Sequence, residues 1–187
     1  MKNNWREISI KEYKRIVDLQ KRELDDESTI IELIAILNET TPEEVWNYSM
    51  SYMNETTNQL GFINDFPKLK KVKYDKLKIG EWDLRCDINM KDFTVAQYTD
   101  FQHYWSLPTK DLARVISVFY KPKGRKYSDG YDIEELVSDI EENIDIVTAN
   151  EIAFFLFRKL WKSTLPSQIF LKLMAQRVAK KMKKIMK

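Results

Sequence analysis

The sequence is poor in the residues that build the commonest chemical sites. Its 187 residues include one cysteine, one histidine, four glycines and five prolines. A single cysteine, Cys86, excludes an internal disulfide and a multi-cysteine metal site, and it suits a reducing compartment. The scarcity of glycine leaves little material for the turns that cradle phosphate groups. We therefore expect neither a metal centre nor a bound cofactor.

Long apolar runs are also missing. Residues 1–5 lack the apolar stretch of a signal peptide, and no later stretch approaches the length that crosses a membrane. The sequence thus predicts a protein that is made in a cytoplasm and has no membrane partner. Hydrophobic residues at 43% and charged residues at 32% are typical of a folded globular chain and argue against disorder.

No group of residues has the spacing of a catalytic site. His103, the only histidine, has no cysteine cluster or obvious nucleophile to serve, so we predict a surface or partly buried imidazole. Residues 128–134 have the composition of a calcium loop, but Arg125 and Leu136 occupy the first and last ligand positions. Asp132 is better explained as a helix N-cap. We expect no catalytic residues and no enzyme.

The start signals of helices occur twice along the chain. In each stretch a hydroxyl residue stands three positions before a glutamate or glutamine, which is the capping-box pattern: Ser9 before Glu12, and Thr94 before Gln97. Apolar residues flank both caps at the spacing of a hydrophobic staple. The two stretches are residues 5–13 and 90–98.

The parallel continues beyond the first helix start. Residues 30–37 parallel 112–119, and residues 41–45 parallel 132–136. Thr41 as N-cap, with Pro42 and Glu44, predicts a third helix that runs on to about residue 60. We therefore predict a mainly α fold with a duplicated three-helix module. Its two copies are assigned to residues 5–60 and 90–143.

Between the modules the apolar period changes to two. Apolar residues alternate with charged ones from Val72 to Tyr74, from Leu77 to Ile79 and from Trp82 to Ile88. Gly80 at the first turn position predicts a type II′ β-hairpin within residues 66–88. Because an isolated two-stranded hairpin is marginally stable, we expect it to lie on the helices or on another chain.

Residues 148–187 are predicted to form two C-terminal helices. Thr148 with Glu151 has the spacing of a capping box, and the following helix is apolar around nearly its whole circumference. Such a helix is either the central core element or an interface. Pro166 separates it from a last helix with an apolar stripe and a basic tail.

Charge is unevenly distributed near the C-terminus. Residues 172–187 contain seven basic residues and no acidic one, whereas residues 129–151 contain nine acidic residues and no basic one. This layout favours a contact within the chain or between copies. The residues that we predict to lie in interfaces are Trp82, Leu171, Met174, Val178, Lys180, Lys181, Met182 and Lys184. We hypothesise that the tail lysines face the acidic stretch 129–151 of an adjacent copy.

Lysine-rich segments also bind nucleic acid. Six lysines between Lys68 and Lys78 form a second basic stripe, but arginine and stacking aromatics are scarce in both basic segments. Nucleic-acid binding is therefore kept as a secondary reading, in which the chain is a DNA-binding accessory protein that uses its lysine tail.

The opening pattern resembles tail-assembly, neck and tail structural proteins of tailed bacteriophages, particularly crAss-like gut phages. The resemblance is carried by Trp5-x-x-Ile8-Ser9-Ile10-x-Glu12-Tyr13, by residues 30–37 and by Thr41-Pro42-Glu43-Glu44. It implies a structural subunit of a phage neck or tail ring, or a tail-assembly chaperone. The expected partners are other copies and other virion proteins, and the expected location is the virion, assembled in the host cytoplasm.

Overall fold

The computed structural model describes residues 1–86, 88, 93–106, 111–127, 129 and 131–164. This part of the chain is mainly helical and carries a small three-stranded antiparallel sheet, which confirms the predicted mainly α class. The helices are α1 (Ile10–Gln20), α2 (Asp26–Asn38), α3 (Pro42–Trp46), α4 (Met50–Gln59), the 3-10 helix η1 (Leu60–Asn64), α5 (Val95–Ser106), α6 (Leu112–Phe119), α7 (Ile133–Asn143) and α8 (Ile146–Thr164). The strands are β1 (Lys76–Ile79), β2 (Trp82–Cys86) and β3 (Tyr120–Pro122).

Four predicted helix caps are present: Ser9, Thr41, Thr94 and Asp132. The Ser9 hydroxyl accepts a hydrogen bond from the backbone N–H of Glu12, and the Glu12 carboxylate accepts one from the backbone N–H of Ser9, which completes the capping box of α1. Reciprocal bonds of the same kind join Thr94 to Gln97 before α5. The caps of the other helices in the two predicted modules are Asp25, Thr41, Asp111 and Asp132.

The prediction of one continuous third helix up to residue 60 is wrong. α3 ends at Trp46, and Ser49 starts a new helix by accepting from the N–H of Tyr52 at 3.3 Å. Asn47 donates its side-chain N–H to the Glu43 carbonyl at 2.8 Å. Short polar side chains that bond to nearby backbone favour caps and turns over helix interiors. Asn47 and Ser49 therefore divide the segment into α3 and α4.

The predicted Thr148 cap is also wrong, because α8 begins at Ile146 and its cap is Asp145. Asp145 accepts from the backbone N–H of Thr148 at 2.9 Å, so Thr148 lies inside the first turn. Glu151, its expected partner, is 2% exposed and bonds to residues distant in sequence. The spacing in this segment fits two alternative caps, and tertiary contacts to Glu151 select Asp145.

The hairpin forms with the predicted turn. Ile79 pairs with Trp82 across Gly80 and Glu81, and φ is positive only at Gly80 (52°), as in a type II′ turn. A third strand that sequence reasoning did not predict, β3, pairs with β2 in antiparallel register. β1, the first strand of the hairpin, begins at Lys76 and not at Val72, where the alternation of apolar and charged residues starts. The hairpin therefore gains its stability from β3 and from α7, which contacts β1.

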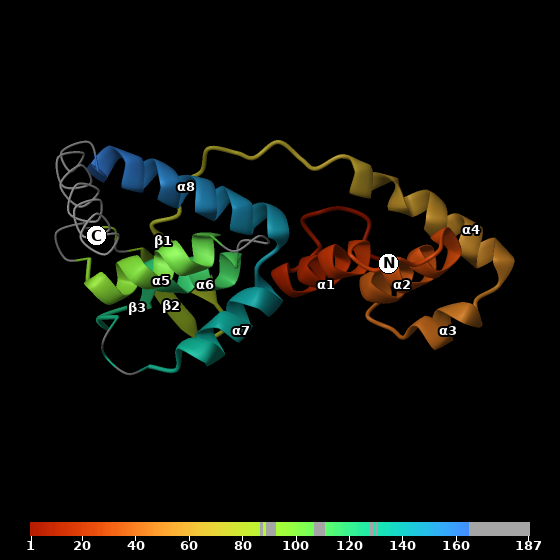
Figure 1. Cartoon of the computed structure of the whole chain (residues 1–187), viewed down its shortest axis with the longest axis horizontal. Coiled ribbons are helices and arrows are strands. Elements are labelled where there is room, and N and C mark those ends of the chain that lie inside the picture. Colours follow the sequence, from red (N-terminus) through yellow and green to blue (C-terminus); the bar gives the residue numbers. More distant parts are fainter. Residues whose placement is uncertain (87, 89–92, 107–110, 128, 130, 165–187) are drawn as a thin grey trace, which may run out of the picture.

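α6 is the most enclosed helix. Every α6 residue except Arg114 is buried, and α6 packs against α5, α7, α8 and β3 (Figure 1). The buried hydrophobic residues of both predicted modules belong to one continuous core. Backbone hydrogen bonds between Ile8 and Ile146 (2.8 Å) and between Ile10 and Ile144 (3.0 Å) join the start of α1 to the start of α8.

The segment between η1 and β1, residues 65–75, follows α8 on the way to the sheet (Figure 1). The Lys70 N–H donates to Glu151, Tyr74 meets the ring of Phe155 edge-on, and Asp75 pairs with Lys159 at 2.6 Å. These contacts hold an extended segment against one side of the helix. None of the helices in the described residues is both long and apolar enough to cross a membrane.

Candidate interaction surface

Trp82 lies against the helical body of its own chain. Its ring is half-buried, and its indole N–H donates to the Asp139 carboxylate of α7 at 2.6 Å. A Trp on a hairpin with its polar atom bonded to the next layer anchors the sheet to the helices. The other seven predicted interface residues, from Leu171 to Lys184, lie outside the described residues.

His103 is exposed on α5, as predicted. Among the described residues, no group of three or more His, Cys, Asp or Glu side chains could hold a metal ion. A polar cavity of about 490 Å³ lies beside Lys2, Ser9, Glu12 and Glu39. Lys2 pairs with both Glu12 and Glu39, so an ion-pair cluster forms part of the lining of this cavity.

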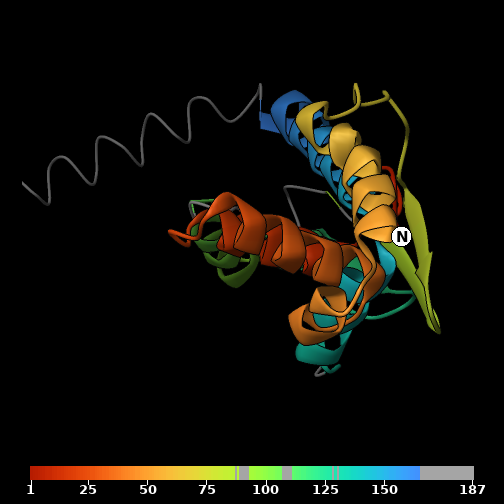
Figure 2. The same cartoon turned by 90° about the vertical axis from the view of Figure 1, so that its right-hand side faces the viewer.

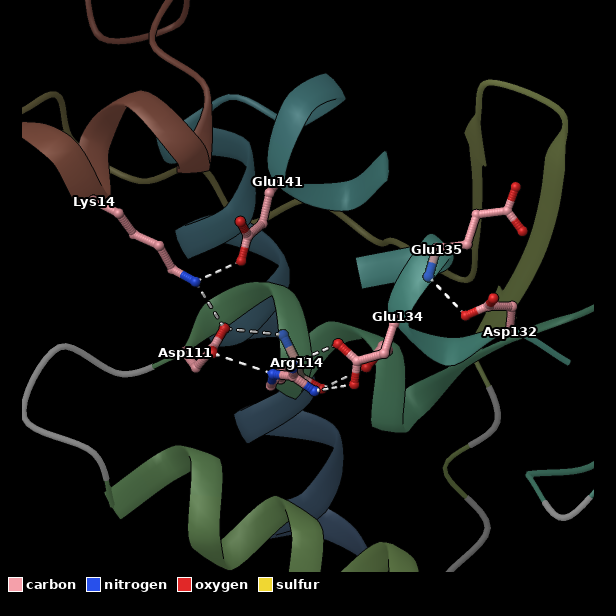
Figure 3. Close-up of polar contacts among 8 residues, drawn as sticks. Lys14, Asp111, Arg114, Asp132, Glu134, Glu135 and Glu141 are labelled. Carbon is pink, nitrogen blue, oxygen red and sulfur yellow. Dashed lines mark hydrogen bonds and ion pairs between the residues drawn. The ribbon is translucent and has the colours of Figure 1, made fainter. Parts of the chain in front are cut away.

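The acidic stretch 129–151 is largely bonded within its own chain. Lys14 of α1 bridges Asp111 (3.2 Å) and Glu141 (2.5 Å), and Arg114 of α6 makes two bonds to Glu134, at 2.7 and 2.6 Å (Figure 3). Carboxylates of this stretch with a hydrogen bond to the chain are Asp129, Asp132, Glu134, Asp139, Glu141, Glu142, Asp145 and Glu151. Glu135 alone of the nine acidic residues lacks such a bond with a described residue, and its carboxylate is directed away from the network in Figure 3.

The network fixes the charge state of its members. The hydrogen bonds from Arg114 hold the pKa of Glu134 below its usual value. Burial alone would lower the pKa of Lys14, but the hydrogen bonds and charges of Glu141 and Asp111 outweigh it and raise the pKa. The acidic stretch thus joins α1, α6 and α7, and basic side chains of the same chain pair with four of its nine carboxylates, those of Glu134, Glu141, Glu142 and Glu151.

Glu151 is the most connected buried carboxylate. It accepts from Arg6 at 2.7 Å, from the Tyr74 hydroxyl at 2.6 Å and from the Lys70 N–H at 3.1 Å. Burial favours the protonated acid, but these three donors outweigh it and lower the pKa of Glu151. Burial and the bond to Glu151 raise the pKa of Tyr74 to about 12. The carboxylate therefore holds residues 65–75 against α8.

A second acidic region, which our sequence reasoning missed, covers α2 to η1. Residues 23–67 contain ten acidic residues and no lysine, arginine or histidine. Glu32, Glu39, Glu44 and Asp25 bond to other side chains or to backbone. Six exposed residues have a carboxylate that makes no hydrogen bond or ion pair with another described residue: Glu23, Asp26, Glu27, Glu43, Glu55 and Asp65. A count of charge along the sequence was sufficient to find this region.

Large apolar side chains are exposed at the junction of α3 and α4. Trp46 is 59% exposed, Met50 75% and Tyr52 43%. Tyr48 is half-buried, and its ring meets the Tyr52 ring edge-on with 4.9 Å between the ring centroids. We call these four residues the α3–α4 corner. It lies at one end of the long axis, the end that faces the viewer in Figure 2. Trp, Tyr and Met are enriched in the cores of protein interfaces.

α8 was predicted from its apolar sequence to be either a central core element or an interface, and it has both a buried face and exposed apolar side chains. Its inner face is buried on α6, yet Phe154 (39%) and Phe157 (48%) are exposed. Residues 65–75 beside it expose Phe66, Leu69 and Val72. The six lysines from Lys68 to Lys78 are exposed, and none pairs with a described carboxylate. This side of the molecule is therefore basic and partly apolar.

Comparison with known proteins adds no relative. The chain matches no protein-family model, no curated protein sequence and no solved structure.

Proposed function

We propose that this chain is a structural subunit of a phage neck or tail ring and that it acts through protein–protein contacts. The observation that carries the proposal is the α3–α4 corner, where Trp46, Met50 and Tyr52 are exposed beside unpaired carboxylates. A single exposed apolar residue needs no explanation, but a cluster of aromatic and methionine side chains marks an interaction site. The phage setting rests on the resemblance of residues 5–13, 30–37 and 41–44.

A duplicated module is part of this proposal. Ser9, Asp25 and Thr41 cap the first three helices of the first module, and Thr94, Asp111 and Asp132 cap the three helices of the second. In both modules the helices pack in consecutive pairs, α1 on α2 on α3 and α5 on α6 on α7. The unequal lengths of α3 and α7 oppose a simple repeat. Residues 9–45 can be superposed on residues 94–136 to test the repeat. If the three helices then run in the opposite order in the two segments, duplication would be removed from the proposal.

The test of the function is the protein content of purified virions of the encoding phage. A structural subunit is retained in mature particles at a copy number that matches a ring, and mass spectrometry of the particles measures it. A tail-assembly chaperone uses the same surfaces but is present in infected cells and absent from the particles. Absence from both would contradict the virion proposal.

DNA binding remains a second candidate because six exposed lysines between Lys68 and Lys78 pair with no described carboxylate. Phosphate contacts give affinity that falls steeply as salt rises. Titration of labelled duplex DNA with the full chain at two salt concentrations tests this candidate. DNA binding that persists at physiological salt, combined with absence from particles, would favour the accessory-protein reading over the structural one.

A further inference from the structure

We propose that the basic C-terminal segment of one copy, residues 167–187, docks on the α3–α4 corner of a second copy, so that copies join head to tail. This inference rests on the proposed function, because it names the surface through which the subunits meet. It also replaces the acidic stretch 129–151 as the acceptor of the tail.

Acidic and basic charges are concentrated in different parts of the chain. Residues 172–187 carry seven basic residues and no acidic one, and residues 23–67 carry ten acidic residues and no basic one. Six of those ten carboxylates are exposed and make no bond with another described residue, whereas only Glu135 is in that state in the stretch 129–151. Complementary charge steers association and fixes the register of a complex. Glu43 of α3, Glu55 of α4 and Asp65 after η1 are three of these six, so α3 and α4 belong to the acidic region that is free to receive the tail.

Both the α3–α4 corner and the tail sequence supply apolar residues for a contact. The corner exposes Trp46, Met50 and Tyr52, and Glu43 and Glu55 lie within a few residues of it. In the sequence of the tail, apolar residues recur at spacings of three and four, which is the pattern that helical ligands place in an apolar groove. These tail residues are Leu171, Met174, Val178, Met182 and Ile185. Apolar contacts with a surround of opposite charges are the composition of a specific interface.

The attachment point of the tail and the α3–α4 corner lie at opposite ends of the molecule. α8, to which the tail is attached, ends at one end of the long axis, and α3 and α4 lie at the other end (Figure 1). When the tail of one copy contacts the α3–α4 corner of another copy, the contact joins two different surfaces of the same protein. Such heterologous contacts close into rings or extend into filaments. The head-to-tail contact therefore produces the kind of assembly that the proposed function requires.

Cysteine cross-linking between full-length chains tests the contact. One preparation carries Met50→Cys and a second carries Met174→Cys, and the two are mixed under mild oxidation. The matched control replaces Met50→Cys by Ser138→Cys, which places the thiol at an exposed site of α7 in the stretch 129–151. We expect about tenfold or more cross-linked heterodimer with Met50→Cys than with the control, because docking raises the effective concentration of the two thiols. The unsubstituted chain, which contains Cys86, gives the background.

Three results would overturn the inference. Cross-linking from Ser138→Cys that equals or exceeds that from Met50→Cys would return the tail to the stretch 129–151. A Met50→Cys/Met174→Cys double variant that closes within one chain at high dilution would make the contact intramolecular. Absence of the heterodimer at concentrations where the full chain self-associates would place the contact elsewhere and leave the proposed function standing. A chain that is monomeric throughout and absent from virions would instead remove the proposed function.

Discussion

At the scale of single residues, buried carboxylates hold together segments that are distant in the sequence. Glu151 joins Arg6, the Lys70 N–H and Tyr74, and Asp139 fixes the Trp82 indole. Each of these bonds depends on tertiary structure. For that reason the sequence predicted Glu151 as a partner of Thr148, and Trp82 was predicted to lie on either the helices or another chain.

Replacing Glu151 by Gln should lower the free energy of unfolding by about 2 kcal/mol at neutral pH, because an amide group is placed against donors that need a carboxylate. The pKa of Glu151 is lowered from 4.5 in the folded chain, so its contribution is complete above that pH and is lost as pH falls through the folded value. Urea unfolding of both proteins should therefore converge on acidification. Glu135→Gln is the control, because the Glu135 carboxylate is exposed and makes no bond with a described residue. This change should alter the free energy of unfolding by less than about 0.5 kcal/mol. A difference that persists at acid pH would show that the loss comes from packing.

Replacing Trp82 by Ala should cost about 2 kcal/mol or more, because it removes a half-buried ring and leaves Asp139 without its donor. Trp82→Phe keeps most of the ring and should cost about 1 kcal/mol, which isolates the hydrogen bond. Thermal or urea unfolding measures both. A loss below about 0.5 kcal/mol for Trp82→Ala would contradict an anchoring role.

At the scale of elements, helix starts marked by a local capping box were predictable, except at Thr148, and the end of α3 was not. The caps at Ser9, Thr41 and Thr94 follow from local spacing alone, because the groups that bond are three residues apart. The break between α3 and α4 depends on competition between Asn47, Ser49 and the helix backbone. β3 was not predicted because three residues that follow a buried helix have no period of their own. Strand pairing of that kind is determined by the sheet edge that β2 offers.

The two capping boxes should contribute equally. Ser9→Ala and Thr94→Ala each remove the side-chain acceptor of a backbone N–H, and each should lower the free energy of unfolding by about 1 kcal/mol. Ser138→Ala, an exposed serine inside α7, is the control and should be neutral or slightly stabilising, because alanine has the higher helix propensity. Chemical unfolding of the three variants measures the comparison. Loss at only one of the two caps would argue against equivalent roles.

At the scale of the whole molecule, charge is divided between an acidic end and a basic side. The acidic stretch 129–151 was predicted as the contact surface from its charge alone, but basic side chains of the same chain pair with four of its nine carboxylates. Residues 23–67 have the same charge signature, and most of their carboxylates remain unpaired. Charge in the sequence therefore led to the proposed kind of contact, whereas the partners seen in the fold indicate which acidic region is free to make it.

Charge-swap complementation between full-length chains tests the head-to-tail account most directly. One variant carries Glu43→Lys and Glu55→Lys at the corner, and the other carries Lys180→Glu and Lys181→Glu in the tail. Each variant alone opposes like charges at the contact, so sedimentation velocity should show self-association weakened by about tenfold or more. Mixing the two variants pairs opposite charges at both contacts and should restore association, which a misfolded variant would not do. Assembly of each variant alone at the strength of the unmodified chain, or a mixture that remains monomeric, would contradict the account.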